Sequence, residues 1–293
     1  MRPPITIQPG AATRAGVPGG DPDAHLASIP ACGALGMRVV ADGDHALALA
    51  LDPRLPATRS AGNGIDPGAA LLLADQATAN GIFATMSAPS PMMTLQLRVD
   101  WIAPPRAGAL VCAVADVVRD GDLALVRGIL RDDDGLSATV TARYLVGAMP
   151  GGFRDVPHGD GATPPSDAAS FDAWLDLQDG GEALTIIPRP DHVGARLLPA
   201  FHGGVVSALI EHAGRRHLAP GFRALDTDVR FLAPARADLP LHASVQPRRS
   251  GRRAATIDVT AYQDDPARPV AVGRLTAVSD AAGTVTAYRL TRG

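Results

Sequence analysis

The chain has 293 residues, of which 46% are hydrophobic and 19% are charged, and its net charge is −3. The length suggests about two domains, and the near-neutral charge gives no reason to expect nucleic acid or an acidic membrane surface as a partner. No apolar run approaches the roughly 20 residues of a membrane span. Only two cysteines occur, Cys32 and Cys112, without metal-ligand spacing, which predicts a reducing, cytoplasmic compartment and no disulfide framework.

The chain begins with a stretch rich in Pro, Gly and Ala, residues 1–24, which lacks the apolar segment of a secretory signal and is interpreted as a flexible leader. A second such stretch, residues 148–169, has no hydrophobic periodicity and is predicted to be a linker. These segments leave two units of similar size, 25–147 and 170–293, which we expect to be two domains.

The two units repeat one another. Residues 99–104 (VDWIAP) match residues 229–234 (VRFLAP) at an offset of 130. Upstream, residues 66–75 match residues 202–211 at an offset of 136. Two repeats are too few for a solenoid, so the sequence predicts a fused pseudo-dimer in which the two units pack against each other.

Each unit is predicted to contain an extended segment, then a long apolar helix, then a run of strands. The extended segments are 37–51 and 174–187, each broken by a turn with glycine. The helices are 67–86 and 203–218. The strands alternate between apolar and polar residues, and they are 94–102, 109–118, 124–131, 137–146, 226–232, 241–246, 254–263 and 270–279.

This order of elements points to the α+β class, in which a helix packs on an antiparallel sheet. The first helix is apolar almost all round, so it should be buried rather than lie on the surface. We therefore predict two tandem units, each with a long central helix packed on a curved antiparallel sheet.

The start of the second helix carries the sharpest motif. His202-Gly203-Gly204 is followed, nine residues after the histidine, by Glu211, and further on by a Val-x-Phe-x-Ala-Pro strand and a Gly-Arg turn. This pattern resembles the PaaI-like (phenylacetate-degradation type) hotdog-fold acyl-CoA thioesterases, and the resemblance extends over both units. It implies a tandem, or double, hotdog fold. It also implies that the helical acid, His202 and Gly203 are catalytic, with Gly204 in the substrate-binding set.

The spacing has a physical reason. The first amides of a helix have no intrahelical partner and lie at the positive end of its dipole, and glycine lets a ligand approach them closely. A thioester carbonyl at the Gly203 N–H would have its developing negative charge stabilised there. An acid among Leu and Ala side chains is in turn a candidate for a functional carboxylate with a perturbed pKa.

The first unit departs from this motif. Asp66 stands in place of the histidine, and Pro67, which has no N–H, stands in place of the first glycine, although Asp75 keeps the acid. About 12 Å of helix separates each helix start from the acid on the same helix, so a donor in one unit must work with the acid of the other. The predicted sites are Asp75 with His202 and Gly203, and Glu211 with Asp66 and Pro67. Only the first of these sites keeps both the acid and the N–H donor.

Structural explanations compete with these roles. His202 would also suit a surface or capping position, and Asp66 is a good helix cap before a proline. Glu211 would merely form a pair with Arg215, four residues on, which contributes a few tenths of a kcal/mol. Asp75 has no basic partner at that spacing.

Further residues are candidates for substrate contact. Gly68 could supply a shifted donor at the first helix start, next to Asp66. The basic run 248–253 is most simply a solvated turn. The resemblance implies that this turn lies near the CoA phosphates, with Arg252 and Arg253 as the contacting side chains.

The predicted reaction is hydrolysis of an acyl-CoA thioester to a free acid and CoA, with the acid as general base or as nucleophile. No metal or added cofactor is expected, because no cluster has metal-ligand spacing and no Gly-rich phosphate loop follows a strand. Two alternatives stay open: a non-catalytic acyl-CoA-binding protein, and a hotdog dehydratase or hydratase. The expected partners are the acyl-CoA and a second copy of the chain, as a homodimer, without nucleic acid or membrane. The acyl group is not specified by the sequence.

Overall fold

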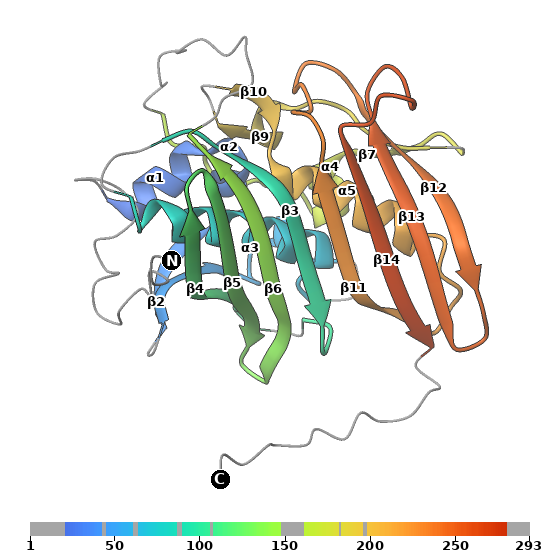
Figure 1. Ribbon diagram of the computed structural model, residues 1–293, viewed down its shortest axis with the longest axis horizontal. Helices are drawn as coiled ribbons and strands as arrows, with labels where there is room; N and C mark the ends of the chain where they lie inside the picture. Colours follow the sequence, from blue (N-terminus) through green and yellow to red (C-terminus); the bar gives the residue numbers. More distant parts are fainter. Residues whose placement is uncertain are drawn as a thin grey trace.

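Twelve strands form one curved antiparallel sheet that wraps around two central helices (Figure 1). The computed structural model describes residues 21–42, 45–60, 64–86, 90–105, 108–147, 161–181, 183–195 and 198–279. Residues 1–20 of the predicted leader, 148–160 of the predicted linker and the predicted turn at Gly43 lie outside the described residues. The strand order is β1-β2-β4-β5-β6-β3-β11-β14-β13-β12-β8-β7.

Each half of the sheet comes from one unit. The first half contains β1 (Arg38–Asp42), β2 (His45–Leu51), β3 (Met92–Trp101), β4 (Leu110–Asp120), β5 (Leu123–Asp132) and β6 (Gly135–Val146). The second half contains β7 (Leu177–Asp179), β8 (Leu184–Ile186), β11 (Phe222–Phe231), β12 (Leu241–Ser250), β13 (Ala254–Tyr262) and β14 (Ala271–Ser279). A separate pair is β9 (Val193–Ala195) with β10 (Leu198–Phe201). The eight long strands lie where the alternation predicts them, apart from a few residues at their ends.

The halves meet where β3 pairs with β11, with Asp100 opposite Asp226. The same irregularity occurs in each half: the register shifts by one residue after Thr94 in β3 and after Ala224 in β11. The two units therefore share one continuous sheet, as expected for a fused pseudo-dimer. The shared irregularity also shows which residue of β3 corresponds to which residue of β11.

The two central helices, α3 (Pro67–Phe83) and α5 (Gly203–Arg215), lie side by side beneath the sheet. The Asp66 carboxylate caps α3 by accepting a hydrogen bond of 2.7 Å from the Gly68 N–H, and Pro67 takes the first helical position. A Cβ atom at Gly204 would lie 2.4 Å from the Leu72 Cα atom, so only glycine allows the helices to approach this closely. The resulting core contains most of α3, whose segment 69–74 is fully buried.

Short helices lie mainly in segments for which the sequence predicts no helix or strand. They are α1 (Pro22–Ser28), α2 (Pro30–Ala34) and α4 (Phe171–Leu175), and two 3-10 turns, η2 (Pro56–Thr58) and η3 (Pro190–His192), accompany them. The prediction that Trp174 is extended is wrong: the Ser170 side chain caps α4 by accepting from the Ala173 N–H at 3.2 Å, and the apolar Phe171 and Trp174 are buried. Prolines begin α1 and α2, where a missing N–H costs nothing.

Residues 161–170, which the sequence assigns to the linker and the start of the second unit, pack on α1 and α2. The Thr163 N–H donates to the Ala27 carbonyl at 2.7 Å, and the Ser166 N–H donates to the Ala34 carbonyl at 2.8 Å. A Cβ atom at Gly33 would lie 2.6 Å from the Thr163 carbonyl oxygen, so this contact leaves no room for a side chain.

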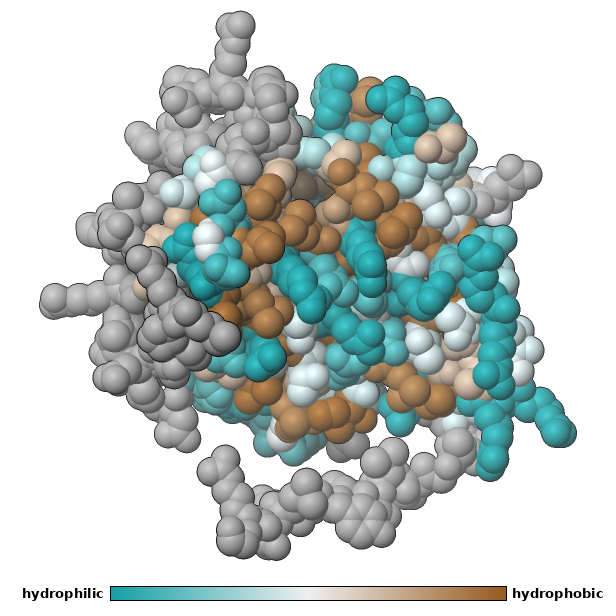
Figure 2. All heavy atoms as spheres, in the orientation of Figure 1, coloured by the Kyte–Doolittle hydropathy of each residue, from teal (hydrophilic) through white to brown (hydrophobic). Residues whose placement is uncertain are grey.

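The outer face of the sheet carries charged and apolar residues side by side (Figure 2). Across its centre, Arg98 of β3 lies 3.9 Å from Asp228 of β11, and Arg274 of β14 lies 2.7 Å from Asp258 of β13. Within the described part of the chain, no helix has the length and apolar character needed to span a membrane.

Candidate active site

Asp75, in the middle of α3, meets the start of α5 from the other unit. Its Oδ2 atom lies 3.4 Å from His202 Nδ1. A Cβ atom at Gly203 would lie only 2.6 Å from the same Oδ2 atom, so the carboxylate fills the space that any other residue would need for its side chain. The structure thus brings together the acid of one unit and the helix start of the other, as the repeat predicts.

His202 caps α5 and is fixed by hydrogen bonds at both ring nitrogens. Nδ1 accepts from the Gly204 N–H at 2.9 Å, and Nε2 lies 3.0 Å from Gln76 Oε1. The Gln76 amide in turn donates to Asn80 at 2.6 Å. This order of donors places the single ring proton of a neutral imidazole on Nε2. Gly204, which the resemblance assigns to the substrate-binding set, therefore donates its N–H to the cap rather than offering it to a ligand.

Burial decides the charges of the acid and the histidine. Asp75 and His202 are 4% and 5% exposed. Burial raises the pKa of Asp75, against the opposing effect of His202, and burial lowers the pKa of His202, against the effect of Asp75. Although the two side chains are close enough for an ion pair, both shifts favour the uncharged forms in the closed site.

Two hydroxyl groups lie beside the Asp75 carboxylate and a third supports one of them, and sequence reasoning does not single these residues out. Thr94 of β3 donates to Oδ1 at 3.0 Å. The Tyr144 hydroxyl of β6 lies 3.0 Å from the Asp75 carbonyl oxygen and 3.5 Å from Oδ1. Thr78, one turn further along α3, lies 2.7 Å from the Tyr144 oxygen. Hydroxyl donors stabilise the charged form of a carboxylate, so this shell opposes the effect of burial.

The second unit has none of these hydroxyls at the equivalent positions. The pair Thr94 and Tyr144, which lie opposite each other in β3 and β6, corresponds to Ala224 and Ala277 in β11 and β14. Thr78 corresponds to Gly214 by the helix offset that relates Asp75 to Glu211. The difference between the two repeats at these positions is the sequence signal that could have identified Thr78, Thr94 and Tyr144.

Glu211, the acid of the second unit, is buried without such support. It is 1% exposed, and both of its carboxylate oxygens lack a hydrogen-bond partner among the described residues. Arg215 Nε lies 3.6 Å away, so the predicted i,i+4 pair is present. Burial raises the pKa of Glu211, and Arg215 opposes that shift.

Asp66, at the start of α3, belongs to a network of charged side chains. Its Oδ1 atom lies 3.0 Å from His212 Nε2, and Arg215 lies 3.5 Å from Oδ2. Burial lowers the pKa of His212, but the hydrogen bond and charge of Asp66 outweigh burial, so the pKa of His212 is raised. Burial raises the pKa of Asp66, but the hydrogen bond and charge of His212 outweigh burial, so the pKa of Asp66 is lowered. The capping role of Asp66 is therefore confirmed, and Gly68 uses its N–H in that cap.

Asp66, Asp172 and His212 come near enough together to hold a metal ion. The two carboxylates, however, lie against different ring nitrogens of His212, because Asp172 is 3.3 Å from Nδ1. Arg215 also contacts Asp66. A cationic guanidinium beside Asp66 and His212 fits an ion-pair network better than a metal site.

Different helices cover the two helix starts. Cys32 of α2 lies 3.9 Å from His202 Nε2, and burial raises the pKa of its thiol well above the usual value. At the other start, Phe171 of α4 stacks on His212 with ring centroids 5.9 Å apart. A Cβ atom at Gly68 would lie 2.7 Å from the Phe171 ring. An aromatic ring therefore occupies the start of α3.

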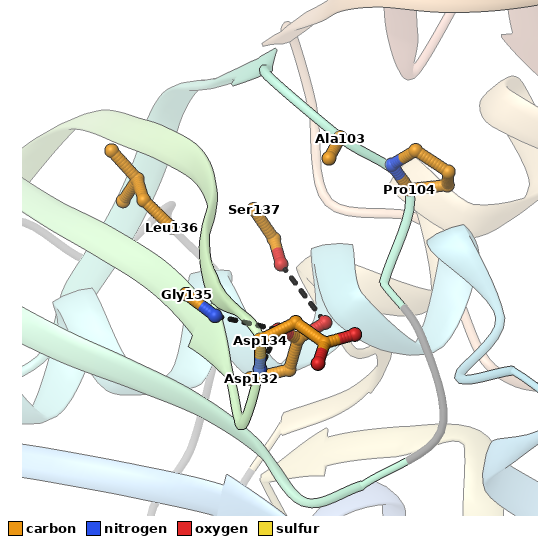
Figure 3. A pocket seen from close by; sticks show the side chains of 7 residues that line it. All are labelled: Ala103, Pro104, Asp132, Asp134, Gly135, Leu136 and Ser137. Carbon is orange, nitrogen blue, oxygen red and sulfur yellow. Dashed lines mark hydrogen bonds between the residues drawn. The ribbon is translucent and has the colours of Figure 1, made fainter. Parts of the chain in front are cut away.

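Arg252 and Arg253 do not lie beside Asp75. The Ser279 N–H at the end of β14 donates to the Arg253 carbonyl at 3.2 Å. Ser279 is opposite Phe222, which begins β11 and so adjoins the end of β3, whereas Thr94 lies near the beginning of β3. The basic turn therefore lies at the end of the strands opposite to the end that is near Asp75. A cavity of about 120 Å³ at the turn between β5 and β6, which Asp132 and Ser137 line, lies at the same end of the strands as the basic turn (Figure 3).

Comparisons with known proteins bear on the second unit and on the fold. A profile of the acyl-CoA thioesterase N-terminal domain family matches residues 196–278. The second hotdog unit thus matches an acyl-CoA thioesterase domain. The match includes His202, Gly203 and Glu211 but not the first unit, and it does not specify the PaaI-like subfamily. No curated protein matches the chain in sequence.

Solved structures resemble most of the chain, across both units. The tesB protein of Mycobacterium avium subsp. paratuberculosis has 12% identity and a TM-score of 0.55, with 88% of this chain and 99% of that chain covered. The 12:0-ACP thioesterase from Umbellularia californica has 9% identity and a TM-score of 0.54, with 83% and 93% covered. A conserved protein of unknown function with hot dog fold from Alicyclobacillus acidocaldarius has 15% identity and a TM-score of 0.51, with 84% and 96% covered. The chain therefore has the double hotdog fold.

Proposed function

We propose that the chain hydrolyses an acyl-CoA thioester to a free acid and CoA at the site that Asp75 forms with the start of α5. The observation that carries the proposal is the contact between Asp75 and Gly203, which places a buried carboxylate beside a helix start that has an N–H and no side chain. The match of residues 196–278 to an acyl-CoA thioesterase domain family supports the same reaction.

Gly203 would stabilise the developing oxyanion. Its N–H belongs to the first turn of α5, where amides have no intrahelical partner and the helix dipole is positive. A thioester carbonyl that accepts from this N–H would be close to the Asp75 carboxylate. One preorganised donor of this kind contributes about 3 kcal/mol to the stability of the transition state.

Asp75 would act in one of two ways, and both give the same products. As a general base, it takes a proton from water while the water oxygen bonds to the thioester carbon; the C–S bond then breaks, and the proton passes to the CoA thiolate. As a nucleophile, its oxygen forms an anhydride with the acyl group, CoA leaves as the thiolate, and water then cleaves the anhydride. Thr94 would hold the carboxylate in either case.

The site has to open for this reaction. Asp75 and His202 are almost fully buried, and Cys32 of α2 lies against the His202 ring. We therefore propose that α2 moves when the acyl chain enters. Protection of the α2 amides from hydrogen exchange should decrease when a non-hydrolysable thioether analogue of the acyl-CoA is bound, while the amides of β13 should stay protected.

The alternative with specific support is non-catalytic binding of acyl-CoA. Phe171 covers the start of α3, and Pro67 offers no N–H there, so one of the two helix starts has lost the expected machinery. Release of free CoA from a panel of acyl-CoA substrates separates the alternatives. Turnover that Asp75→Asn abolishes supports hydrolysis; tight binding of several acyl-CoA molecules without turnover supports a binding protein.

Other predictions stay proposals. They are the PaaI-like subfamily, the domain boundaries, the pairing of two chains as a homodimer, the cytoplasmic location, and a phosphate contact by Arg252 or Arg253. The position of the basic turn argues against a phosphate contact at the Asp75 site. A CoA bound at this turn would have its phosphates at the end of the strands near the start of α3 rather than near Asp75.

A further inference from the structure

Tyr144 joins the last strand of the first unit to the middle of α3. Its hydroxyl lies 3.0 Å from the Asp75 carbonyl oxygen, 3.5 Å from Asp75 Oδ1 and 2.7 Å from Thr78 Oγ1. Thr78 Oγ1 also lies 2.7 Å from the Ala74 carbonyl oxygen, so its one hydrogen serves either that carbonyl or the phenolic oxygen. When Thr78 donates to the phenol, the single phenolic hydrogen is directed at Asp75, where it is shared between the main-chain carbonyl and the carboxyl group.

We infer that Tyr144 is a positioning residue, which sets where the Asp75 carboxylate lies and favours its charged form. For the reaction itself, the inference rests on the proposed function; for the state of the carboxyl group, it rests on the geometry alone. Tyr144 is 1% exposed, so its ring cannot turn out to solvent. Burial raises the pKa of its hydroxyl well above the usual value, so the group stays a donor at every working pH.

The second unit shows what happens to a buried helical acid without this tyrosine. Ala277 stands where Tyr144 would be, since it pairs with Ala224 just as Tyr144 pairs with Thr94. Gly214 stands in place of Thr78. Both oxygens of Glu211 are then left without a hydrogen bond among the described residues. The hydroxyl of Tyr144 is thus a feature of the unit whose acid meets a helix start with a glycine N–H.

The test is the substitution Tyr144→Phe, which removes only the hydroxyl. A donor to a carboxylate stabilises the charged form, so its loss raises the pKa of Asp75. The acid limb of the profile of kcat/KM against pH should move up by about one pH unit. At the optimal pH, kcat should fall about tenfold, as expected for one hydrogen bond to a charged group, while KM changes less than about twofold. A merely structural role would lower the melting temperature without moving the acid limb.

Tyr262→Phe is the matched control, because it removes the same hydroxyl from β13, where Tyr262 lies against the His242 ring. Its pH profile should equal that of the wild type. If Tyr144→Phe does not fold, Tyr144→Met serves instead, since it also removes the hydroxyl and fills much of the space of the ring. An unchanged acid limb in the folded variant, Tyr144→Phe or otherwise Tyr144→Met, overturns the inference.

An infrared titration separates this inference from the proposed function. The buried carboxyl band that disappears in Asp75→Asn reports the protonation of Asp75 without any substrate. In Tyr144→Phe that band should titrate at higher pH than in the wild type. If no acyl-CoA is hydrolysed but the band shifts, the proposed function fails and the positioning role stands. If hydrolysis occurs and the band does not shift, the proposed function stands and the positioning role fails.

Discussion

The starts of α3 and α5 are equivalent by sequence offset and by position in the fold, yet they meet different surroundings. At the start of α5, a histidine cap and a glycine leave room for the carboxylate of Asp75. At the start of α3, Pro67 removes the N–H, and the Asp66 cap is tied into charged partners. The comparison teaches that both units have a buried helical acid, but only the acid of the first unit meets a helix start with a glycine N–H.

The acids themselves show the same division. Asp75 has hydroxyl donors from two strands, whereas Glu211 has only Arg215 at 3.6 Å and no hydrogen bond among the described residues. An unsatisfied buried carboxylate costs free energy. Glu211 is therefore explained better as part of an ion-pair network than as a second catalytic group.

The largest expected effect is that of Asp75→Asn. It keeps the shape of the side chain but removes the base or nucleophile, so kcat/KM should fall by about two to four orders of magnitude. Asp258→Asn, on the outer face of the sheet, is the control and should keep full activity. Release of CoA measures both. A variant of Asp75 that folds and keeps more than a tenth of the activity would remove this residue from the mechanism.

Gly203→Ala should have the next largest effect. The new methyl group would lie 2.6 Å from Asp75 Oδ2 and would push the carboxylate away. A displacement of about 1 Å commonly lowers the rate about 100-fold. Gly251→Ala, in the exposed basic turn, is the control. The interpretation of the helix start is wrong if Gly203→Ala, folded to the same melting temperature, hydrolyses the substrate at the normal rate.

His212→Gln should break the ion-pair network without lowering activity more than a few-fold. It copies into the second unit the residue that the first unit has at the equivalent position, Gln76. Loss of one member of a buried pair costs about 3 kcal/mol of unfolding free energy. Denaturant unfolding measures this cost, with His242→Gln, outside the network, as the control.

The cost of His212→Gln should depend on pH. The folded-state pKa of His212 is raised, so its stabilisation is complete below the unfolded value, about 6.5, and is lost as the pH rises through the raised value. The folded-state pKa of Asp66 is lowered, so its contribution is complete above its unfolded value, about 3.9, and is lost as the pH falls. The cost should therefore be largest between about pH 4 and 6.5. A cost that grows towards pH 9 contradicts this account of the network.

The smallest expected effect is that of a chelator. EDTA should leave CoA release unchanged, because Arg215 pairs with Asp66 in the group of Asp66, Asp172 and His212 that is compact enough for a metal ion. A zinc peptidase in the same buffer would confirm that chelation is effective. Loss of activity that zinc or magnesium restores would require a metal site.

Much of this fold is predictable from the sequence, because each signal is local or repeated. The apolar run of α3 and the alternation in the eight long strands define the two units. The motif at His202, taken from the resemblance, and its repeat at an offset of 136 then predict that the acid of one unit faces the helix start of the other. The length of helix between each start and its own acid supplies the geometric part of this step.

The surroundings of the site are not predictable in the same way. Thr94 and Tyr144 lie on strands 19 and 69 positions from Asp75, and only the sheet register brings them to it. Neither residue type is unusual in a strand, so no local pattern marks them. The short helices α2 and α4 escape prediction because tertiary contacts, through Cys32 and Phe171, hold segments too short to be helical alone.

The most direct test of the central claim is the activity of Glu211→Gln. If the start of α5 with Asp75 forms the one hydrolytic site, this variant should release CoA within about fivefold of the wild-type rate, since its acid faces a helix start without an N–H at Pro67. A loss as large as that of Asp75→Asn, in a variant that stays folded, would contradict the account and would give the network of Asp66 and His212 a catalytic role.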